Sequence, residues 1–195
     1  MLQINCTLVG VADLMFSKYV PEGKRDDETH DQREHRTWKQ KVSVTSGGEC
    51  FLQPFALKNC LESAAKWLSL KIPGERNKTF TKRFLSGILV TDKLMLTDAS
   101  GRQLTMDDID PMELFVPSDG VRGSGKRVIK VFPTLHEWQA EASVIVFDNK
   151  ITEDVFDRHI DAAGKFIGLG AMRVGNGGIN GRFACEDLSS EEVGS

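Results

Sequence analysis

Two amphipathic helical segments, each set among β-like segments, constrain the fold of this 195-residue chain more than any other feature. The first begins at Pro54 and ends before Pro73-Gly74. Its apolar residues recur at helical spacing and predict one buried face: Leu57, Leu61, Ala64 and Leu68. The second has Thr152 as its N-cap, Val155, Phe156, Ile160 and Ala163 as its buried stripe, and Gly164 as its C-cap.

The segments around these helices have the β-branched and alternating composition of strands. They are Gln3–Val11, Trp38–Val44, Gly87–Val90, Lys93–Leu96, Glu113–Val116, Lys126–Phe132, Ala140–Phe147 and Arg182–Cys185. Gly87–Val90 and Lys93–Leu96 form either a hairpin or one bent strand. Two helices among antiparallel strands predict an α+β fold with a ferredoxin-like or RRM-like core. We expect one domain over residues 1–188, followed by a frayed acidic tail at 189–195.

One segment does not fit this core. Residues 18–37 contain Pro21 and Gly23, and between Glu22 and Arg36 there are six acidic and four basic side chains. Such a segment cannot bury a face of its own, so it predicts an inserted arm, as a protruding hairpin or a mobile loop.

Composition restricts the class of protein. With 25 basic and 28 acidic residues the formal charge is -3, which excludes a uniformly basic nucleic-acid-binding domain but not local basic surfaces. We expect neither a signal peptide nor a membrane span, and therefore a cytoplasmic protein. Cys6, Cys50, Cys60 and Cys185 are widely spaced, and we expect them to be reduced and mostly buried.

Glycine is concentrated near the C-terminus, where seven of the residues 164–181 are glycine. Glycine lets a backbone approach a ligand closely, and we favour a ligand-binding loop over an irregular turn. The segment 120–127 resembles a phosphate-binding P-loop, but Arg127 occupies the position of the magnesium-binding Ser or Thr and a strand follows instead of a helix. We therefore expect a hairpin tip there.

Basic residues gather in two runs, 71–83 and 122–130. Together with the glycine-rich segment they predict a face that follows a phosphate backbone, with Phe80 and Phe84 either stacking on bases or lying in the core. The predicted contacts are Lys58, Arg83, Arg122, Lys126, Arg127, Arg173, Asn176 and Arg182, with Gly168 and Gly170 for close backbone approach.

The remaining polar residues give little indication of catalysis. His30 and His35 lie among carboxylates, but their spacing of five does not favour a helical metal site. We expect His159 to pair with neighbouring aspartates on a helix surface, and Asp13 to be an exposed acid. No nucleophile–base set is recognisable from spacing. We thus predict no catalytic residues, no metal and no cofactor.

Several segments resemble the RAMP superfamily, the RRM-like proteins that form the guide-RNA-binding backbone of CRISPR effector complexes. The first strand leads into an insertion at 18–36, where such subunits carry a thumb-like hairpin. Residues 51–61, Phe-Leu-Gln-Pro-Phe-Ala-Leu-Lys-Asn-Cys-Leu, are similar to the entry of the family's first helix, with Phe55-Ala56 in place of the usual Gly-Ser. Residues 167–182 are similar to its C-terminal glycine-rich loop. The resemblance implies RNA as a partner, and either a CRISPR subunit or a stand-alone, for example phage-encoded, relative.

The first hypothesis is therefore a non-catalytic protein that binds RNA or single-stranded DNA and assembles along it as a homo-oligomer or with other effector subunits. The alternative is a protein-interaction module of the phage-inhibitor type, whose acidic runs at 98–113 and 186–192 imitate phosphate and dock on a basic protein. A metal-dependent enzyme built on His30 and His35 is the third hypothesis.

Overall fold

The computed structural model describes residues 1–121, 123 and 125–194. Its main elements are, in chain order, β1 (Leu2–Gly10), β2 (Leu14–Met15), α1 (His30–Thr37), β3 (Phe51–Leu52), α2 (Pro54–Leu68), α3 (Thr81–Ser86), β4 (Ile88–Val90), β5 (Leu94–Thr97), β6 (Asp110–Pro117), β7 (Arg127–Leu135), β8 (Gln139–Val146), α4 (Glu153–Ala162) and β9 (Phe183–Glu192). Short helical turns occupy Trp38–Lys41, Met106–Asp108, Ala163–Ile167 and Val174–Asn176.

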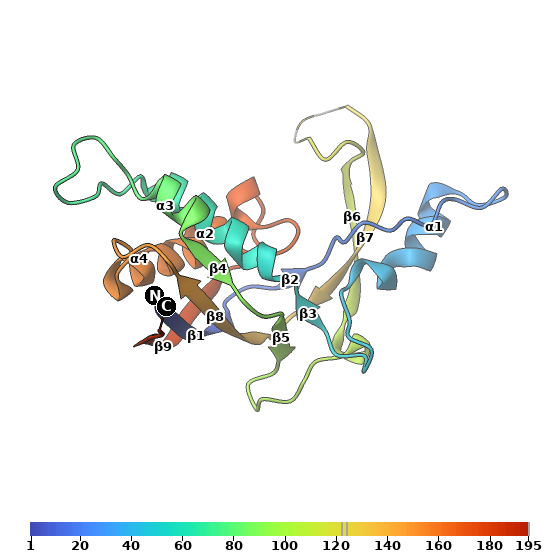
Figure 1. The fold of residues 1–195 in the computed structure, drawn as a ribbon. Helices are drawn as coiled ribbons and strands as arrows, with labels where there is room; N and C mark the ends of the chain where they lie inside the picture. The colour runs from blue at the N-terminus through green and yellow to red at the C-terminus, as the bar shows by residue number, and fades with distance from the viewer. Residues whose placement is uncertain (122, 124, 195) are drawn as a thin grey trace.

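Six of these elements form a ferredoxin-like core. In the chain they follow as β1-α2-β4-β8-α4-β9, while in the sheet the strands lie as β9-β1-β8-β4, each pair antiparallel. Each helix thus connects two strands that are separated by a third, which is the split βαβ arrangement. Figure 1 shows α2, α3 and α4 together on one side of this sheet. The predicted α+β fold class is confirmed.

The edge beside β8 consists of two pieces. β4 pairs with the Val144–Val146 end of β8, and β5 pairs with Gln139 and Ala140 at its other end. The segments 87–90 and 93–96 are therefore one bent edge along β8 and do not form a hairpin with each other.

Helix α2 follows the sequence pattern closely. Pro54 occupies the first turn, where its missing N–H costs nothing, and Ser69 ends the helix in the left-handed region at φ 46°. Of the predicted stripe, Leu57, Leu61 and Ala64 are buried, while Leu68 is half-buried. Cys60 and Ala65, which were not predicted, are buried beside them.

Helix α4 begins as predicted but ends later. The Thr152 hydroxyl accepts a hydrogen bond from the Val155 N–H at 3.3 Å, as an N-cap does. Gly164 is not the C-cap, because the chain continues through a π-helical turn to Ile167 and leaves it at Gly168. At position 164 a Cβ atom would lie 2.0 Å from the carbonyl oxygen of Phe183, so glycine is needed there for close packing against β9.

The prediction for His159 is wrong. Its side chain is fully buried, at 0% exposure, and stacks on Phe84 with 4.1 Å between ring centroids. Its Nδ1 atom lies 2.6 Å from the Val155 carbonyl oxygen. Burial lowers the pKa of this imidazole, because the charged form loses its hydration. The neighbouring aspartates suggested a surface pair, but the 3.6-residue helical period places position 159 on the buried face with Phe156 and Ile160.

The arm lies beside a second, three-stranded sheet of order β2-β7-β6. The long hairpin β6–β7 and α1 project together at the end of the molecule away from the chain termini (Figure 1). The arm contains helix α1 and no strand pair. Thr29 and Gln32 cap this helix reciprocally, the Thr29 hydroxyl accepting from the Gln32 N–H at 3.2 Å.

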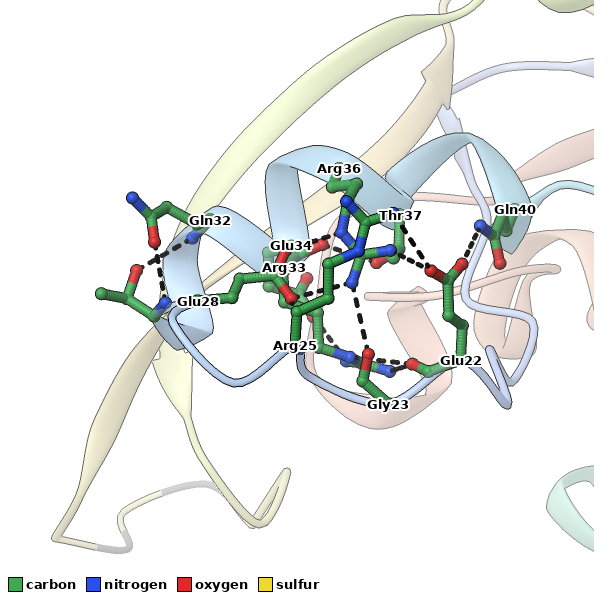
Figure 2. Close-up of polar contacts among 11 residues, drawn as sticks. Glu22, Gly23, Arg25, Glu28, Gln32, Arg33, Glu34, Arg36, Thr37 and Gln40 are labelled. Atoms are coloured by element: carbon green, nitrogen blue, oxygen red, sulfur yellow. Dashed lines mark hydrogen bonds and ion pairs between the residues drawn. The ribbon is translucent and has the colours of Figure 1, made fainter.

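Ion pairs order the loop that precedes α1. Figure 2 shows Arg33 and Arg36 reaching from the helix to this loop. Arg36 donates two hydrogen bonds to the Glu28 carboxylate, at 2.6 and 2.8 Å, and pairs with Glu22. Arg33 donates to the Glu22 carbonyl oxygen at 2.7 Å. Hydrogen bonds from Arg36 hold the pKa of Glu28 down at about 2. The arm is thus folded back on itself, although it has almost no apolar core.

A buried ion pair attaches the arm to β7. Glu34 accepts a hydrogen bond from the Val131 N–H at 3.0 Å, and Lys41 donates to the Val131 carbonyl oxygen at 2.7 Å. Glu34 and Lys41 also bond to each other. On the edge of β7 that faces away from β6, Glu34 and Lys41 therefore occupy the N–H and the carbonyl oxygen of Val131, which a neighbouring strand would otherwise pair with. The strand predicted over Trp38–Val44 is therefore wrong: the 3-10 turn Trp38–Lys41 places Lys41 beside Val131 instead.

The C-terminal strand is longer than predicted. Residues 189–192, Ser-Ser-Glu-Glu, belong to β9 and pair with residues 2–5 of β1, so the expectation of a frayed tail there is wrong. Acidic side chains are compatible with this strand because one face of the sheet is open to solvent. The four cysteines are free thiols, three of them buried, as predicted.

Candidate nucleic-acid interface

A cavity of about 670 Å³ separates the β6–β7 hairpin from the glycine-rich loop. One wall comes from the hairpin, with Arg127, Lys130 and Phe132 on β7. The other comes from Met172 and from residues 176–178. Two segments that are about fifty residues apart in the sequence, and that were both predicted to bind ligand, therefore face each other across a single cavity.

Three cationic residues near the tip of the hairpin were predicted to contact phosphate. The Arg127 guanidinium lies 5.5 Å from the Phe115 ring centroid and donates to the Phe115 carbonyl oxygen at 3.0 Å. Lys126 is exposed at the start of β7. Arg122 lies outside the described residues. Arg127 thus keeps its charge at the cavity wall while one edge of its guanidinium is held by the hairpin.

The glycine-rich loop is a compact structure. Gly178 N–H and Asn180 N–H donate to the carbonyl oxygens of Arg173 and Met172, at 3.1 and 3.2 Å, and these bonds close the loop. Gly170 has φ 74°, and a Cβ there would lie 2.4 Å from the Met15 carbonyl oxygen, so this glycine is required for packing against β2. Gly168 ends the π-helical turn at φ 75°. Both predicted glycines therefore have a role in the fold, and close approach to a ligand stays a prediction for them.

A second cavity, of about 520 Å³, lies on the other side of residues 170–173. It contains the N-terminus of α2, where Gln53 makes no side-chain cap, together with Lys18, Lys41 and Arg173. The Arg173 Nε atom is buried and has no hydrogen-bond partner among the described residues. Helix N-terminal N–H groups and cations both favour an anion.

Two predicted phosphate contacts have other partners and line neither cavity. The Lys58 ammonium bonds Glu62 and the carbonyl oxygens of Phe84 and Leu85, at 3.0 and 2.9 Å, which uses its three donors. The Arg83 guanidinium bonds Asp148 at 2.6 Å and Glu75 at 2.8 Å, and the Asp148 hydrogen bond raises its pKa. Both residues fasten α3 to its surroundings.

The other predicted contacts lie on the glycine-rich segment. Asn176 is exposed in the turn Val174–Asn176 and lines the first cavity. Arg182 lines neither cavity; it is exposed and donates to the Lys165 carbonyl oxygen at 3.3 Å. The structure thus brings Arg127 and Asn176 to one cavity and Arg173 and Gly170 to the next. Lys130 lines the first cavity and Lys41 the second, although neither was predicted, because the sequence does not reveal which lysines border a cavity. The Lys41 ammonium is already bonded to Glu34 and to the Val131 carbonyl oxygen.

Among the described residues, the strand-paired positions on the open face of the sheet expose no aromatic ring. Strand pairing places these residues on it: Gln3, Asn5, Thr7, Val9, Leu89, Thr97, Gln139, Glu141, Ser143, Ile145, Ala184, Glu186, Ser189 and Glu191. None of these side chains is basic or aromatic, but along β3 and β5 the same face continues with Phe51 and Met95, and the Lys93 ammonium lies 4.6 Å from the Phe51 ring centroid. RRM sheets stack bases on exposed aromatic residues, whereas Phe51 is buried, at 5% exposure. Phe80 and Phe84 are buried, so of the two alternatives for these residues the structure supports a place in the core and not stacking on bases.

The histidines and acids considered for catalysis are placed as follows. Asp13 is not a free acid, because it lies 3.2 Å from His136 Nδ1, while Asp110 lies 3.4 Å from Nε2 of the same ring. His35 lies 3.6 Å from Glu113. Within the described part of the chain, no three His, Cys, Asp or Glu side chains are grouped as metal ligands.

Among the helices that the structure describes, none is long and apolar enough to cross a membrane.

Comparison with known proteins concerns structure alone. No family model matches the sequence, and no curated protein matches it. Over 97% of its length the chain is similar to a chain in the cryo-EM structure of type III-B Cmr-β bound to cognate target RNA, with 10% identity and a TM-score of 0.49. Over 96% it is similar to a chain of a CRISPR RNA-guided surveillance complex, with 8% identity and a TM-score of 0.39. The chain spans 60% and 67% of the length of these two chains. The assignment of the ferredoxin-like fold rests on the strand order described above.

Proposed function

We propose that this protein binds single-stranded nucleic acid, RNA or DNA, without catalysing a reaction on it. The observation that carries the proposal is the cavity between the β6–β7 hairpin and the glycine-rich loop, with Arg127 and Lys130 on its wall. Cations on a groove attract the phosphate backbone, and polar loop groups such as Asn176 offer hydrogen bonds to it.

The second cavity extends this surface past residues 170–173. There, phosphate would meet the uncapped N-terminus of α2 and the Arg173 guanidinium, whose Nε donor is unused. The negative net charge of the chain does not oppose binding, because three carboxylates, Glu141, Glu186 and Glu191, lie on the open face of the sheet instead.

Salt dependence is the first test. If five cations, namely Lys126, Arg127, Lys130, Arg173 and Arg182, contact phosphates of a single strand, the logarithm of the association constant should fall with that of the salt concentration with a slope of about -3.5. Between 50 and 200 mM salt the affinity for an oligonucleotide should then decrease about a hundredfold.

A triple variant localises the interface. Lys126→Ala, Arg127→Ala and Lys130→Ala together should reduce the salt slope by about 2 and weaken binding. A control that removes three exposed lysines elsewhere, Lys24→Ala, Lys82→Ala and Lys150→Ala, loses the same charge and should bind nearly as wild type. Equal losses in both triple variants, or no binding of any oligonucleotide by the wild type, would refute the proposal. Light scattering with and without oligonucleotide tests whether copies assemble along it.

One observation favours a second function, docking on a basic protein. The carboxylates Glu141, Glu186 and Glu191 share the open face of the sheet with no basic side chain at the paired positions. The acidic run 98–113 suits this role less, because Arg102 bonds both Asp98 and Asp108 and holds the pKa of Asp108 at about 2. The hairpin triple variant separates the two functions, since it should spare binding to a basic protein.

A further inference from the structure

Two aromatic side chains are stacked on the surface of the helical layer. The rings of Trp67 and Phe166 have centroids 5.5 Å apart and planes inclined by 22°. Trp67 is 63% exposed and Phe166 is 45% exposed. Large apolar rings that are held in one orientation in water offer a preformed flat surface to a ligand.

The pair is continuous with the glycine-rich segment. Phe166 belongs to the π-helical turn that ends at Gly168, and Arg182 donates to the carbonyl oxygen of the adjacent Lys165 at 3.3 Å. Lys66, next to Trp67, is exposed. The Lys165 ammonium pairs with Asp161 at 2.7 Å. Arg182 thus brings one cationic side chain to the turn that carries Phe166, and Lys66 is a second exposed cation in the last turn of α2.

The exposed face of α2 connects the pair to the second cavity. Phe55, Asn59, Ser63 and Trp67 follow at intervals of four residues, so each is the neighbour of the next, and the row winds by about 120° around the helix from Phe55 to Trp67. Phe55 and Asn59 line the cavity at the start of α2, and Phe55 is exposed as well. At 1.5 Å per residue, Trp67 lies about 18 Å further along the helix axis. This row of side chains on α2 thus connects the second cavity to the Trp67–Phe166 pair.

The size and the surroundings of the patch favour a base over a protein. Two rings are far smaller than the roughly 800 Å² that a stable protein interface buries on each partner. An aromatic ring beside cations has the chemistry that binds a single strand, because bases stack on the ring while phosphates meet the charge. A base inside a duplex is stacked on both sides and cannot offer its face in this way.

We propose that the Trp67–Phe166 pair stacks an unpaired base of a single strand that runs along the exposed face of α2. This inference rests on the proposed function and specifies its ligand, since it requires unpaired bases and places one of them. Trp67 supplies the main stacking surface, and Phe166 holds its ring in place from the π-helical turn.

The test measures binding of a labelled oligothymidylate and an oligouridylate, each of about 20 nucleotides, and of a duplex of the same length. Trp67→Ala should weaken single-strand binding about five- to a hundredfold, and Trp67→Phe should restore most of it. Leu89→Ala, which removes an exposed apolar side chain from the open face of the sheet, is the matched control and should bind as wild type. Binding should also quench the tryptophan fluorescence of the wild type but not that of Trp67→Phe, in which the half-buried Trp38 and the buried Trp138 are the remaining tryptophans.

The outcomes separate this inference from the proposed function. If Trp67→Ala binds as wild type while the hairpin triple variant loses affinity, the stacking site is wrong and the nucleic-acid interface stands. If the wild type binds no single strand, both are wrong. Equal affinity of the wild type for duplex and single strand would overturn the requirement for unpaired bases. Loss of self-association in Trp67→Ala, with unchanged oligonucleotide affinity, would assign the pair to a contact between copies of the chain.

Discussion

The buried pair Glu34–Lys41 should be one of the largest polar contributions to the stability of this protein. Glu34→Ala removes the partner of the Val131 N–H, and Val131 is fully buried. An unsatisfied buried N–H costs about 1–3 kcal/mol. The change also leaves the Lys41 ammonium without its counter-ion in a site where its side chain is only 11% exposed. We therefore expect Glu34→Ala to lower the free energy of unfolding by about 2–4 kcal/mol.

Further variants separate the contribution of the Val131 hydrogen bond from that of the ion pair, and one serves as a control. Glu34→Gln keeps an acceptor for the Val131 N–H and loses the charge, so it should cost about 1–2 kcal/mol. With Lys41→Ala already present, Glu34→Ala should cost less, and the difference should be about 1–2 kcal/mol. Glu137→Ala, at an exposed glutamate, should stay within about 0.5 kcal/mol of wild type.

Urea unfolding of the wild type and of the five variants (Glu34→Ala, Glu34→Gln, Lys41→Ala, the Glu34→Ala/Lys41→Ala double variant and Glu137→Ala) measures these differences, with an unchanged slope m as evidence that the transition itself is the same. Two results would refute the role of the pair as a cap on the β7 edge. One is a loss below about 0.5 kcal/mol for Glu34→Ala, the amount expected of an ordinary surface change. The other is a loss that does not depend on whether Lys41 is present.

Two shorter predictions concern the core. Burial lowers the pKa of His159 below the value of about 6.5 that a histidine has in the unfolded chain, so the unfolded state binds more protons once the pH drops below about 6.5. The free energy of unfolding should therefore decrease as the pH is lowered through this range, by at most about 1.4 kcal/mol per pH unit. His159→Phe should remove this part of the pH dependence; identical urea midpoints against pH for both proteins would contradict the assignment. Gly164→Ala should lower the melting temperature by about 4–8 °C, because its Cβ would lie 2.0 Å from the Phe183 carbonyl oxygen, whereas Gly23→Ala, with open space around it, should not. Thermal unfolding followed by circular dichroism tests this pair, and equal melting temperatures would show that the helix–strand contact yields easily.

Local signals made the core predictable from the sequence. Helix α2 has an apolar stripe and Pro54 at its start, and α4 has Thr152 as its cap, so both could be placed without knowledge of their partners. The order of strands and helices then left few arrangements apart from a split βαβ core. Long-range pairing was not predictable: residues 189–192 form a strand only because β1 lies beside them.

The candidate interface was predictable in part for the same reason. Charge and glycine content indicated the hairpin and the glycine-rich loop, and Arg127 and Asn176 do line one cavity. The sequence does not tell which cations are already paired, so Lys58 and Arg83 were predicted as phosphate contacts although carboxylates and carbonyl oxygens occupy their donors. Lys41 was missed because its position depends on a turn that resembles a strand in its alternation.

The pairing of the first and last strands determines how the molecule responds to force. The two chain ends lie together, with the Met1 amino group 3.4 Å from the Val193 carbonyl oxygen, and β1 and β9 run antiparallel from that corner (Figure 1). Tension between the ends therefore acts perpendicular to the strands, along the hydrogen bonds that join β1 and β9, and breaks these bonds one after another. Since β8 holds β1 on its other side, β9 should peel away first. A load applied between the hairpin tip and either end would instead have to shear whole strands, so the same protein should be weak along one axis and strong along another.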